Sequence, residues 1–134
     1  MADRILVVDD HAMHRMFARL VLEGEGYEVC EAADARSAEL ALVDGKARLA
    51  LVDIELPDAS GLELVRRLRA VAGDSLCIVA FSGHSGEGMR RQALAAGFDG
   101  YILKPMDGRG LLERVAQHLA PGLAAGEIGK GGRS

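Results

Sequence analysis

The sequence predicts an α/β fold, a doubly wound five-stranded parallel sheet with helices on both faces. Two observations predict it. Short apolar runs alternate along the chain with segments whose apolar residues recur at helical spacing. The run at residues 49–52 is apolar at every position, as in a strand covered on both faces of a parallel sheet. Such alternation favours right-handed strand–helix–strand units and a layer of helices on each face of the sheet.

Five strands are predicted, at residues 4–8, 27–31, 49–52, 76–81 and 100–103. The first is a β-branched run that ends on Asp9 and Asp10, which indicates a central strand. The second alternates between apolar and polar residues. We therefore expect it to be less buried than the first and to lie at an edge of the sheet.

Five helices are predicted between and after the strands. The first is amphipathic, with an apolar stripe of Met13, Met16, Phe17, Leu20 and Val21. The second is capped by Asp34 and runs to about residue 44, with Ala38, Ala41 and Leu42 inward. The third begins at a Ser60–Glu63 capping box and buries Leu64, Val65, Leu68 and Val71. The fourth begins at Ser85, with Met89, Ala93 and Ala96 inward and Arg90 and Arg91 outward. The fifth is capped by Asp107 and buries Leu111, Leu112, Val115 and Leu119.

Composition narrows the function classes. The chain has 134 residues, 49% of them hydrophobic, and a formal net charge of −4. We predict one domain at residues 1–120 and a flexible, glycine-rich tail at 121–134. No apolar run is long enough to span a membrane, and the absence of a basic patch argues against nucleic-acid binding by this chain alone. The first residues lack the apolar core of a secretory signal, so we expect a cytoplasmic protein with Cys30 and Cys77 as buried reduced thiols.

Four of the predicted strands end on groups that phosphoryl transfer would need. The first ends on Asp9 and Asp10, the third on Asp53, the fourth on Ser82 and the fifth on Lys104. Ligand sites of open α/β sheets lie beyond the carboxyl ends of the strands, so we expect these side chains in one crevice. Carboxylates packed together repel one another, which favours a divalent cation. Oxygen ligands point to Mg²⁺, with Mn²⁺ as the substitute.

These motifs resemble the receiver domain of two-component response regulators over residues 4–119. The resemblance rests on Val7-Val8-Asp9-Asp10, Leu51-Val52-Asp53-Ile54-Glu55-Leu56-Pro57, Gly61-Leu62-Glu63, Phe81-Ser82-Gly83 and Ala96-Gly97-Phe98-Asp99-Gly100-Tyr101-Ile102-Leu103-Lys104-Pro105. It implies a flavodoxin-like, CheY-like fold with strand order 2-1-3-4-5. That order places Cys30 and Cys77 three strand spacings apart, too far for a disulfide.

The resemblance also implies roles for individual residues. Asp53 would be the phosphoacceptor, and Asp9, Asp10, Asp53 and the backbone carbonyl of Glu55 would hold Mg²⁺, with Asp9 acting largely through water. Lys104 would contact the phosphoryl group, with the peptide bond before Pro105 expected to be cis. Ser82 and Tyr101 would move as a switch that alters the face formed by the fourth helix, fifth strand and fifth helix.

The chain departs from the family pattern at two positions without losing a functional group. Ser82 stands where threonine is more frequent, and Gly83 where alanine is commoner. Two further positions that modulate phosphoryl lifetime in the family hold Glu55 and His84. We hypothesise that these two side chains flank the phosphoryl group and tune the attack of water.

Three other histidines are interpreted as structural. His11 and His14 are expected on a solvated polar face, because no further ligand was recognised near them in the sequence. His118 suits the negative end of the last helix.

The predicted function is a phosphoacceptor in a two-component or phosphorelay system, with only self-catalysed aspartyl phosphorylation and dephosphorylation rather than enzyme activity. The implied partners are a sensor histidine kinase or histidine phosphotransferase, and a downstream protein or a missing output domain. The alternative is a small phosphohydrolase that forms an aspartyl phosphate, which would require an Asp where Glu55 stands. An FMN-binding flavodoxin is disfavoured because Asp9 and Asp10 would repel its phosphate.

Overall fold

The computed structural model describes residues 3–83, 86–104 and 107–120. Within them, five strands alternate with five α-helices, and a short 3-10 turn precedes the fourth strand. The elements are β1 (Arg4–Val8), α1 (Ala12–Gly24), β2 (Glu28–Ala32), α2 (Ala35–Ala41), β3 (Ala47–Val52), α3 (Gly61–Ala72), η1 (Gly73–Ser75), β4 (Cys77–Ser82), α4 (Glu87–Ala96), β5 (Gly100–Leu103) and α5 (Gly108–Leu119). None of the described helices has the length and apolar character needed to cross a membrane. The predictions for the tail, for Ser85 and for the peptide before Pro105 lie outside the described residues.

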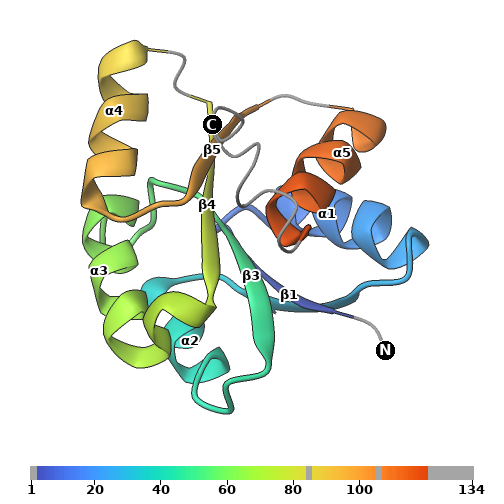
Figure 1. Ribbon diagram of the computed structural model, residues 1–134, viewed down its shortest axis with the longest axis horizontal. Helices are drawn as coiled ribbons and strands as arrows, with labels where there is room; N and C mark the ends of the chain where they lie inside the picture. Colours follow the sequence, from blue (N-terminus) through green and yellow to red (C-terminus); the bar gives the residue numbers. More distant parts are fainter. Residues whose placement is uncertain (1–2, 84–85, 105–106, 121–134) are drawn as a thin grey trace.

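The strands form one parallel sheet in the order β2-β1-β3-β4-β5, as predicted. β2 is an edge strand, as is β5, and it is the least buried of the five, whereas β1 and β3 lie in the interior of the sheet. In Figure 1 the helices α2, α3 and α4 lie on one side of the sheet and α1 and α5 on the other. This doubly wound arrangement brings the carboxyl ends of all five strands to one edge.

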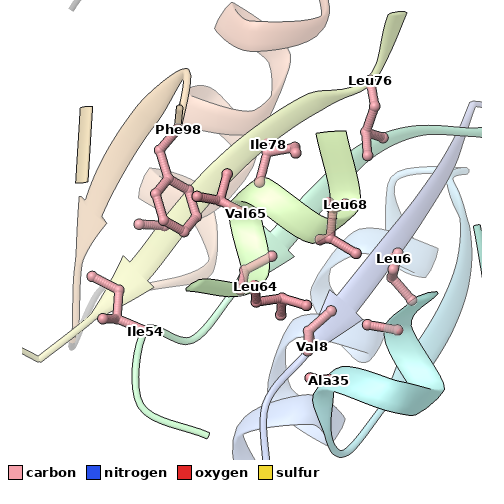
Figure 2. Close-up of a cluster of buried hydrophobic side chains, with 14 of the residues drawn as sticks. Leu6, Val8, Ala35, Ile54, Leu64, Val65, Leu68, Leu76, Ile78 and Phe98 are labelled. Atoms are coloured by element: carbon pink, nitrogen blue, oxygen red, sulfur yellow. The ribbon is translucent and has the colours of Figure 1, made fainter. Parts of the chain in front are cut away.

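Each face of the sheet carries its own apolar core, which explains why β1, β3 and β4 are apolar at successive positions. Leu6, Ala50 and Ile78 point toward α2, α3 and α4, and pack with Leu64, Val65 and Leu68 of α3 (Figure 2). The alternate residues Ile5, Leu49, Leu51 and Val79 pack on the other face with residues of α1 and α5. Full burial of one such side chain stabilises the fold by about 1.5–3 kcal/mol.

Three of the predicted helix caps are present. Asp34 Oδ1 accepts a hydrogen bond from the Ser37 N–H at 2.8 Å. Ser60 Oγ accepts one from the Glu63 N–H at 3.1 Å. Asp107 Oδ1 accepts one from the Gly110 N–H at 2.7 Å. The cap of α2 is confirmed although the helix ends at Ala41 instead of near residue 44.

Two predictions about helix faces are wrong. In α3, Val71 is 46% exposed, because the buried face ends at Leu68 one turn earlier. In α1, three residues of the apolar stripe are exposed, Met13 at 75%, Met16 at 55% and Leu20 at 66%, whereas Val21 packs against the core. The residues of α1 that are buried against the sheet are instead Ala18 and Leu22.

Contacts on both flanks of the buried residues accompany this rotation of α1. Arg15 and Arg19, one turn before Ala18 and Leu22, both donate to the Glu31 carboxylate of β2, at 2.9 and 2.6 Å. On the opposite flank, Val21 packs close to Gly108 at the start of α5. Ala18 and Leu22, between these contacts, are the residues of α1 that are buried.

The two cysteines are both free, as predicted, but each is partly buried instead of fully buried. Cys30 in β2 packs against the core under α2, α3 and α4, and Cys77 in β4 against the core under α1 and α5. They therefore face opposite sides of the sheet as well as lying three strands apart in its order. Burial, reinforced by the charge of Asp99 and opposed by Arg69, raises the pKa of Cys77 to about 12.

Candidate functional site

Polar residues stand at the carboxyl ends of four neighbouring strands. Asp9 and Asp10 follow β1, Asp53 follows β3, Ser82 is the last residue of β4, and Lys104 follows β5. Backbone hydrogen bonds extend the sheet to these positions. The Asp53 N–H donates to the Val8 carbonyl at 2.8 Å, and the Lys104 N–H donates to the Ser82 carbonyl at 2.7 Å. The sheet therefore holds the site residues at one edge.

Asp9 is the most buried carboxylate of the site, at 2% exposure. Its Oδ1 accepts from the His11 N–H at 2.9 Å, and its Oδ2 accepts from Lys104 Nζ at 2.8 Å. Burial alone would raise the pKa of Asp9. The hydrogen bond from Lys104, the one from the His11 N–H and the positive charge of Lys104 outweigh it and lower the pKa below its usual value. Asp9 is therefore a fixed anion.

Asp53 is held differently. It is 8% exposed, and its Oδ1 accepts a hydrogen bond from the Glu55 N–H at 3.0 Å. Its Oδ2 lies 3.8 Å from Lys104 Nζ, beyond hydrogen-bond distance. Burial is the main reason that the pKa of Asp53 is raised, and the charges of Asp9 and Asp10 add to it. The Glu55 N–H and Lys104 oppose that rise without cancelling it.

The acidic residues are close enough to share a cation. One ligand atom each from Asp9, Asp10, His11 and Asp53 lies within 4.8 Å of the others. Three carboxylates lie close together here, and Lys104 Nζ lies 2.8 Å from Asp9 and 3.8 Å from Asp53. The excess of negative charge and the hard oxygen donors fit a divalent ion such as Mg²⁺.

A glycine shapes the turn after Asp53. The Gly61 N–H donates to the Ile54 carbonyl, and a Cβ on Gly61 would overlap the Ile54 backbone. Glu55 also pairs with Ser60 in an isolated antiparallel bridge. The segment between β3 and α3 is therefore closed by a backbone contact that only glycine permits. This contact fixes where the Asp53 loop leaves the sheet.

The predicted switch residues Ser82 and Tyr101 are both buried. Ser82 is 1% exposed and Tyr101 is 8% exposed. The Tyr101 carbonyl accepts a hydrogen bond from Arg114 of α5 at 3.0 Å. The Glu55 side chain is exposed, as a lifetime-tuning residue would have to be, while His84 lies outside the described residues.

His11 and His14 are exposed, as expected of a solvated polar face, but a further potential ligand does lie near them. His14 Nδ1 lies 3.2 Å from Asp9 Oδ2 and 3.1 Å from Lys104 Nζ. His11 Nδ1 lies 3.4 Å from Asp9 Oδ1 and 3.1 Å from Asp10 Oδ1. Both rings border the Asp9 carboxylate because α1 begins directly after the first strand end, so its first turn folds back over Asp9. The short separation in sequence was the signal that could have found them.

Two further contacts were not predicted from the sequence. Arg15 donates to the Asp9 backbone carbonyl at 2.7 Å and so ties α1 to the strand end. The Lys104 ammonium lies 5.1 Å from the centroid of the Phe81 ring, a distance at which a cation is attracted to an aromatic face. Together with Asp9, this ring holds the long lysine side chain across the site.

The model of the response regulator receiver domain family matches residues 5–116 of this chain. The chain belongs to this family. Receivers are the phosphoacceptor domains of two-component systems, which explains why acidic and basic groups gather at the strand ends. The chain is therefore a signalling domain of this class, and the predicted fold is confirmed.

Individual relatives agree with this assignment. The receiver is 38% identical over 132 residues to the phosphate regulon transcriptional regulatory protein PhoB of Pseudomonas aeruginosa, covering 96% of this chain and 58% of PhoB. It is 36% identical over 102 residues to the virulence transcriptional regulatory protein PhoP of Salmonella typhimurium, covering 76% of this chain and 45% of PhoP. It thus spans about half the length of these relatives. The crystal structure of a CheY-like receiver domain from Methanospirillum hungatei has a TM-score of 0.79 and 36% identity, with 89% of this chain and 94% of that chain covered.

Proposed function

We propose that Asp53 is the phosphoacceptor of this receiver and that it takes a phosphoryl group from a phosphohistidine of a partner protein. The observation that carries the proposal is the difference between Asp53 and the two other aspartates. Both Asp9 oxygens accept hydrogen bonds from described groups, at 2.9 and 2.8 Å, and the pKa of Asp9 is lowered. Asp10 is partly exposed to solvent. Asp53 combines burial, a raised pKa and an Oδ2 atom whose nearest cation is 3.8 Å away.

The transfer is a displacement at phosphorus. Asp53 Oδ2 attacks the phosphorus, the new P–O bond forms, and the P–N bond to the partner's imidazole breaks. The bonding pair goes to the imidazole nitrogen, which takes a proton from solvent. Lys104 swings from Asp9 to donate to the phosphoryl oxygens, and the Ser82 hydroxyl donates to them from behind. The product is an acyl phosphate on Asp53.

The acidic cluster suits Mg²⁺, with Mn²⁺ as a substitute. Asp9, Asp10, Asp53 and the backbone carbonyl of Glu55 would hold it, with Asp9 acting largely through water. The ion, when bound, supplies positive charge to the transferring phosphoryl oxygens and to the crowded carboxylates. Apart from that charge, nucleophile, cation and hydroxyl all come from the chain.

Phosphorylation is proposed to act outward through Ser82 and Tyr101 on the face formed by α4, β5 and α5. Glu55 and His84 are proposed to set the lifetime of the phosphoryl group. The donor would be a sensor histidine kinase or a histidine phosphotransferase in the cytoplasm. The output would be a downstream protein or an output domain, since the matched regions cover only 58% of the relative PhoB and 45% of PhoP. Self-catalysed phosphorylation and dephosphorylation are the only chemistry proposed for the chain itself.

Intact mass measurement tests the proposal. Incubation with Mg²⁺ and a small-molecule phosphodonor such as acetyl phosphate should add one phosphoryl group to the wild-type chain and none to Asp53→Asn. The matched control is Asp74→Asn, which removes an exposed carboxylate in η1 and should leave the adduct unchanged. An equal adduct in Asp53→Asn would rule out Asp53, and steady release of phosphate from many phosphomonoesters would favour the phosphohydrolase alternative.

A further inference from the structure

Two imidazoles converge on the carboxylate of Asp9. His11 Nδ1 lies 3.4 Å from Asp9 Oδ1, and His14 Nδ1 lies 3.2 Å from Asp9 Oδ2. The ring centroids of the two histidines are 4.7 Å apart. One ligand atom from each of these three residues lies within 4.8 Å of the others. The two histidine side chains are 63% and 44% exposed, so an ion can reach them from solvent.

Lys104 already places a positive charge beside two of these ligand atoms. Its ammonium nitrogen lies 2.8 Å from Asp9 Oδ2 and 3.1 Å from His14 Nδ1. A carboxylate oxygen and an imidazole nitrogen therefore lie next to one cation in the structure.

We propose that Asp9, His11 and His14 form a binding site for a divalent transition ion such as Zn²⁺, distinct in its ligands from the all-oxygen set suited to Mg²⁺. Imidazole and carboxylate together suit Zn²⁺, whereas Mg²⁺ prefers oxygen. Ligands about 2.0–2.1 Å from a tetrahedral ion are separated by about 3.3 Å. His11 Nδ1 is 3.4 Å from Asp9 Oδ1 and His14 Nδ1 is 3.2 Å from Asp9 Oδ2, so each imidazole lies near that spacing from one oxygen of the carboxylate. Three protein ligands leave the fourth position to water or to Asp10, whose Oδ1 is 3.1 Å from His11 Nδ1.

The site has a consequence for phosphoryl transfer, which rests on the function proposed above. Zn²⁺ bound to Asp9 would break the contact between Asp9 and Lys104 and would also withdraw the Asp9 carboxylate from the acidic cluster. Lys104 would be driven away by a double positive charge near its present position, and the Mg²⁺ ligand set would lose one carboxylate. Zn²⁺ therefore acts as an inhibitor of phosphorylation at Asp53 that competes with Mg²⁺.

Titration calorimetry on the whole, chelator-stripped chain tests the site directly. Zn²⁺ should bind the wild type with a stoichiometry of one. His11→Gln and His14→Gln should each weaken that binding at least about tenfold, since each loses one of three protein ligands while keeping an amide that can hydrogen-bond to Asp9. His118→Gln is the matched control, because His118 packs beside Gly100 at the opposite end of β5. Mg²⁺ affinity should stay within about twofold in all three variants, because Mg²⁺ does not require the imidazoles.

The proposal is overturned if the His11→Gln/His14→Gln double variant binds Zn²⁺ as tightly as the wild type, or if His118→Gln weakens binding equally. A second measurement separates this proposal from the phosphoacceptor assignment. With Mg²⁺ and acetyl phosphate present, added Zn²⁺ should reduce the mass adduct in the wild type, and the double variant should keep its adduct. Zn²⁺ binding without loss of the adduct would overturn the inhibition. Absence of any adduct before Zn²⁺ is added would count against the phosphoacceptor, while the calorimetry would still decide the Zn²⁺ site.

Discussion

Replacing Asp53 with asparagine should stabilise the fold when no divalent cation is present. Asparagine keeps the size of the side chain and an oxygen that can accept from the Glu55 N–H, which donates to Asp53 Oδ1 at 3.0 Å in the structure. What it removes is a buried negative charge that faces two other carboxylates. The expected gain follows from the raised pKa of Asp53, whose main cause is burial.

The distances give the size of the effect. Lys104 Nζ, 3.8 Å from Asp53 Oδ2, attracts the charge by about 4.4 kcal/mol at an effective dielectric of about 20. Ligand atoms of Asp9 and Asp10 lie within 4.8 Å of that of Asp53, so each repels it by at least about 3.5 kcal/mol on the same scale. The net Coulomb energy therefore disfavours the charge on Asp53 by about 2–3 kcal/mol. Solvent around the partly exposed Asp10 screens some of it, which leaves an expected gain of about 1–2 kcal/mol.

Urea unfolding at neutral pH in the presence of a chelator measures the gain, with Asp74→Asn as the control for loss of an ordinary surface charge. The sign depends on pH. Because the folded pKa of Asp53 is raised above the model value of 3.8, the wild type loses stability as pH rises through that window. The advantage of Asp53→Asn should therefore vanish below the unfolded pKa and be complete above the folded one. Added Mg²⁺ should reverse the order by stabilising the wild type more. An Asp53→Asn variant that is less stable than the wild type without divalent cations would refute the electrostatic reasoning.

Three further predictions concern the fold. Gly61→Ala should destabilise the chain by about 1–3 kcal/mol, because the added Cβ would meet the Ile54 backbone. Gly83→Ala is the control: no atom lies within 4 Å of its added carbon, so the urea midpoint should change little. Leu22→Ala should lower the free energy of unfolding by about 2–5 kcal/mol in the same assay. Leu20→Ala, at a residue that is 66% exposed, should lower it by less than about 0.5 kcal/mol. Equal losses would mean that α1 is rotated differently. Cys77, with a pKa of about 12, should react with iodoacetamide at pH 8 about a thousandfold more slowly than an unperturbed thiol, and rapid alkylation in the folded chain would contradict its burial.

Most of the sheet could be predicted because each strand has a local signal. The apolar run ending at Val52 and the Asp that follows it define both the strand and its carboxyl end. The caps at Asp34, Ser60 and Asp107 are local for the same reason, since each side chain bonds a backbone N–H three residues ahead. These features depend on neighbours in sequence and not on distant contacts.

The rotation of α1 could not be predicted, because periodicity finds an apolar stripe but not its partner. Met13 and Leu20 of that stripe are exposed, whereas Ala18 and Leu22 are buried. Arg15 and Arg19 pair with Glu31 of β2, a contact between residues distant in the chain that the pattern does not reveal. An amphipathic pattern gives the helix, and only tertiary contacts give its orientation.

The sequence indicates which residues gather at the site better than it indicates their contacts with one another. Asp53 and Lys104 do lie near each other, but Lys104 bonds Asp9 at 2.8 Å and lies 3.8 Å from Asp53. Whether Lys104 bonds Asp9 or Asp53 depends on how buried each carboxylate is and on the other donors to its oxygens. The contacts of His11 and His14 with Asp9 arise because the chain turns from β1 into α1 at this point, which the spacing of the two histidines alone does not reveal.

The central claim is that Asp53, and no other residue, carries the phosphoryl group. Treating the phosphorylated chain with borohydride tests it, since hydride reduces an acyl phosphate to an alcohol and leaves free carboxylates intact. Peptide mass mapping should then find homoserine at position 53 alone, and only when Mg²⁺ and the phosphodonor were both present. Homoserine at position 9 or 10, or a phosphoryl group retained on a histidine with position 53 unchanged, would contradict the account.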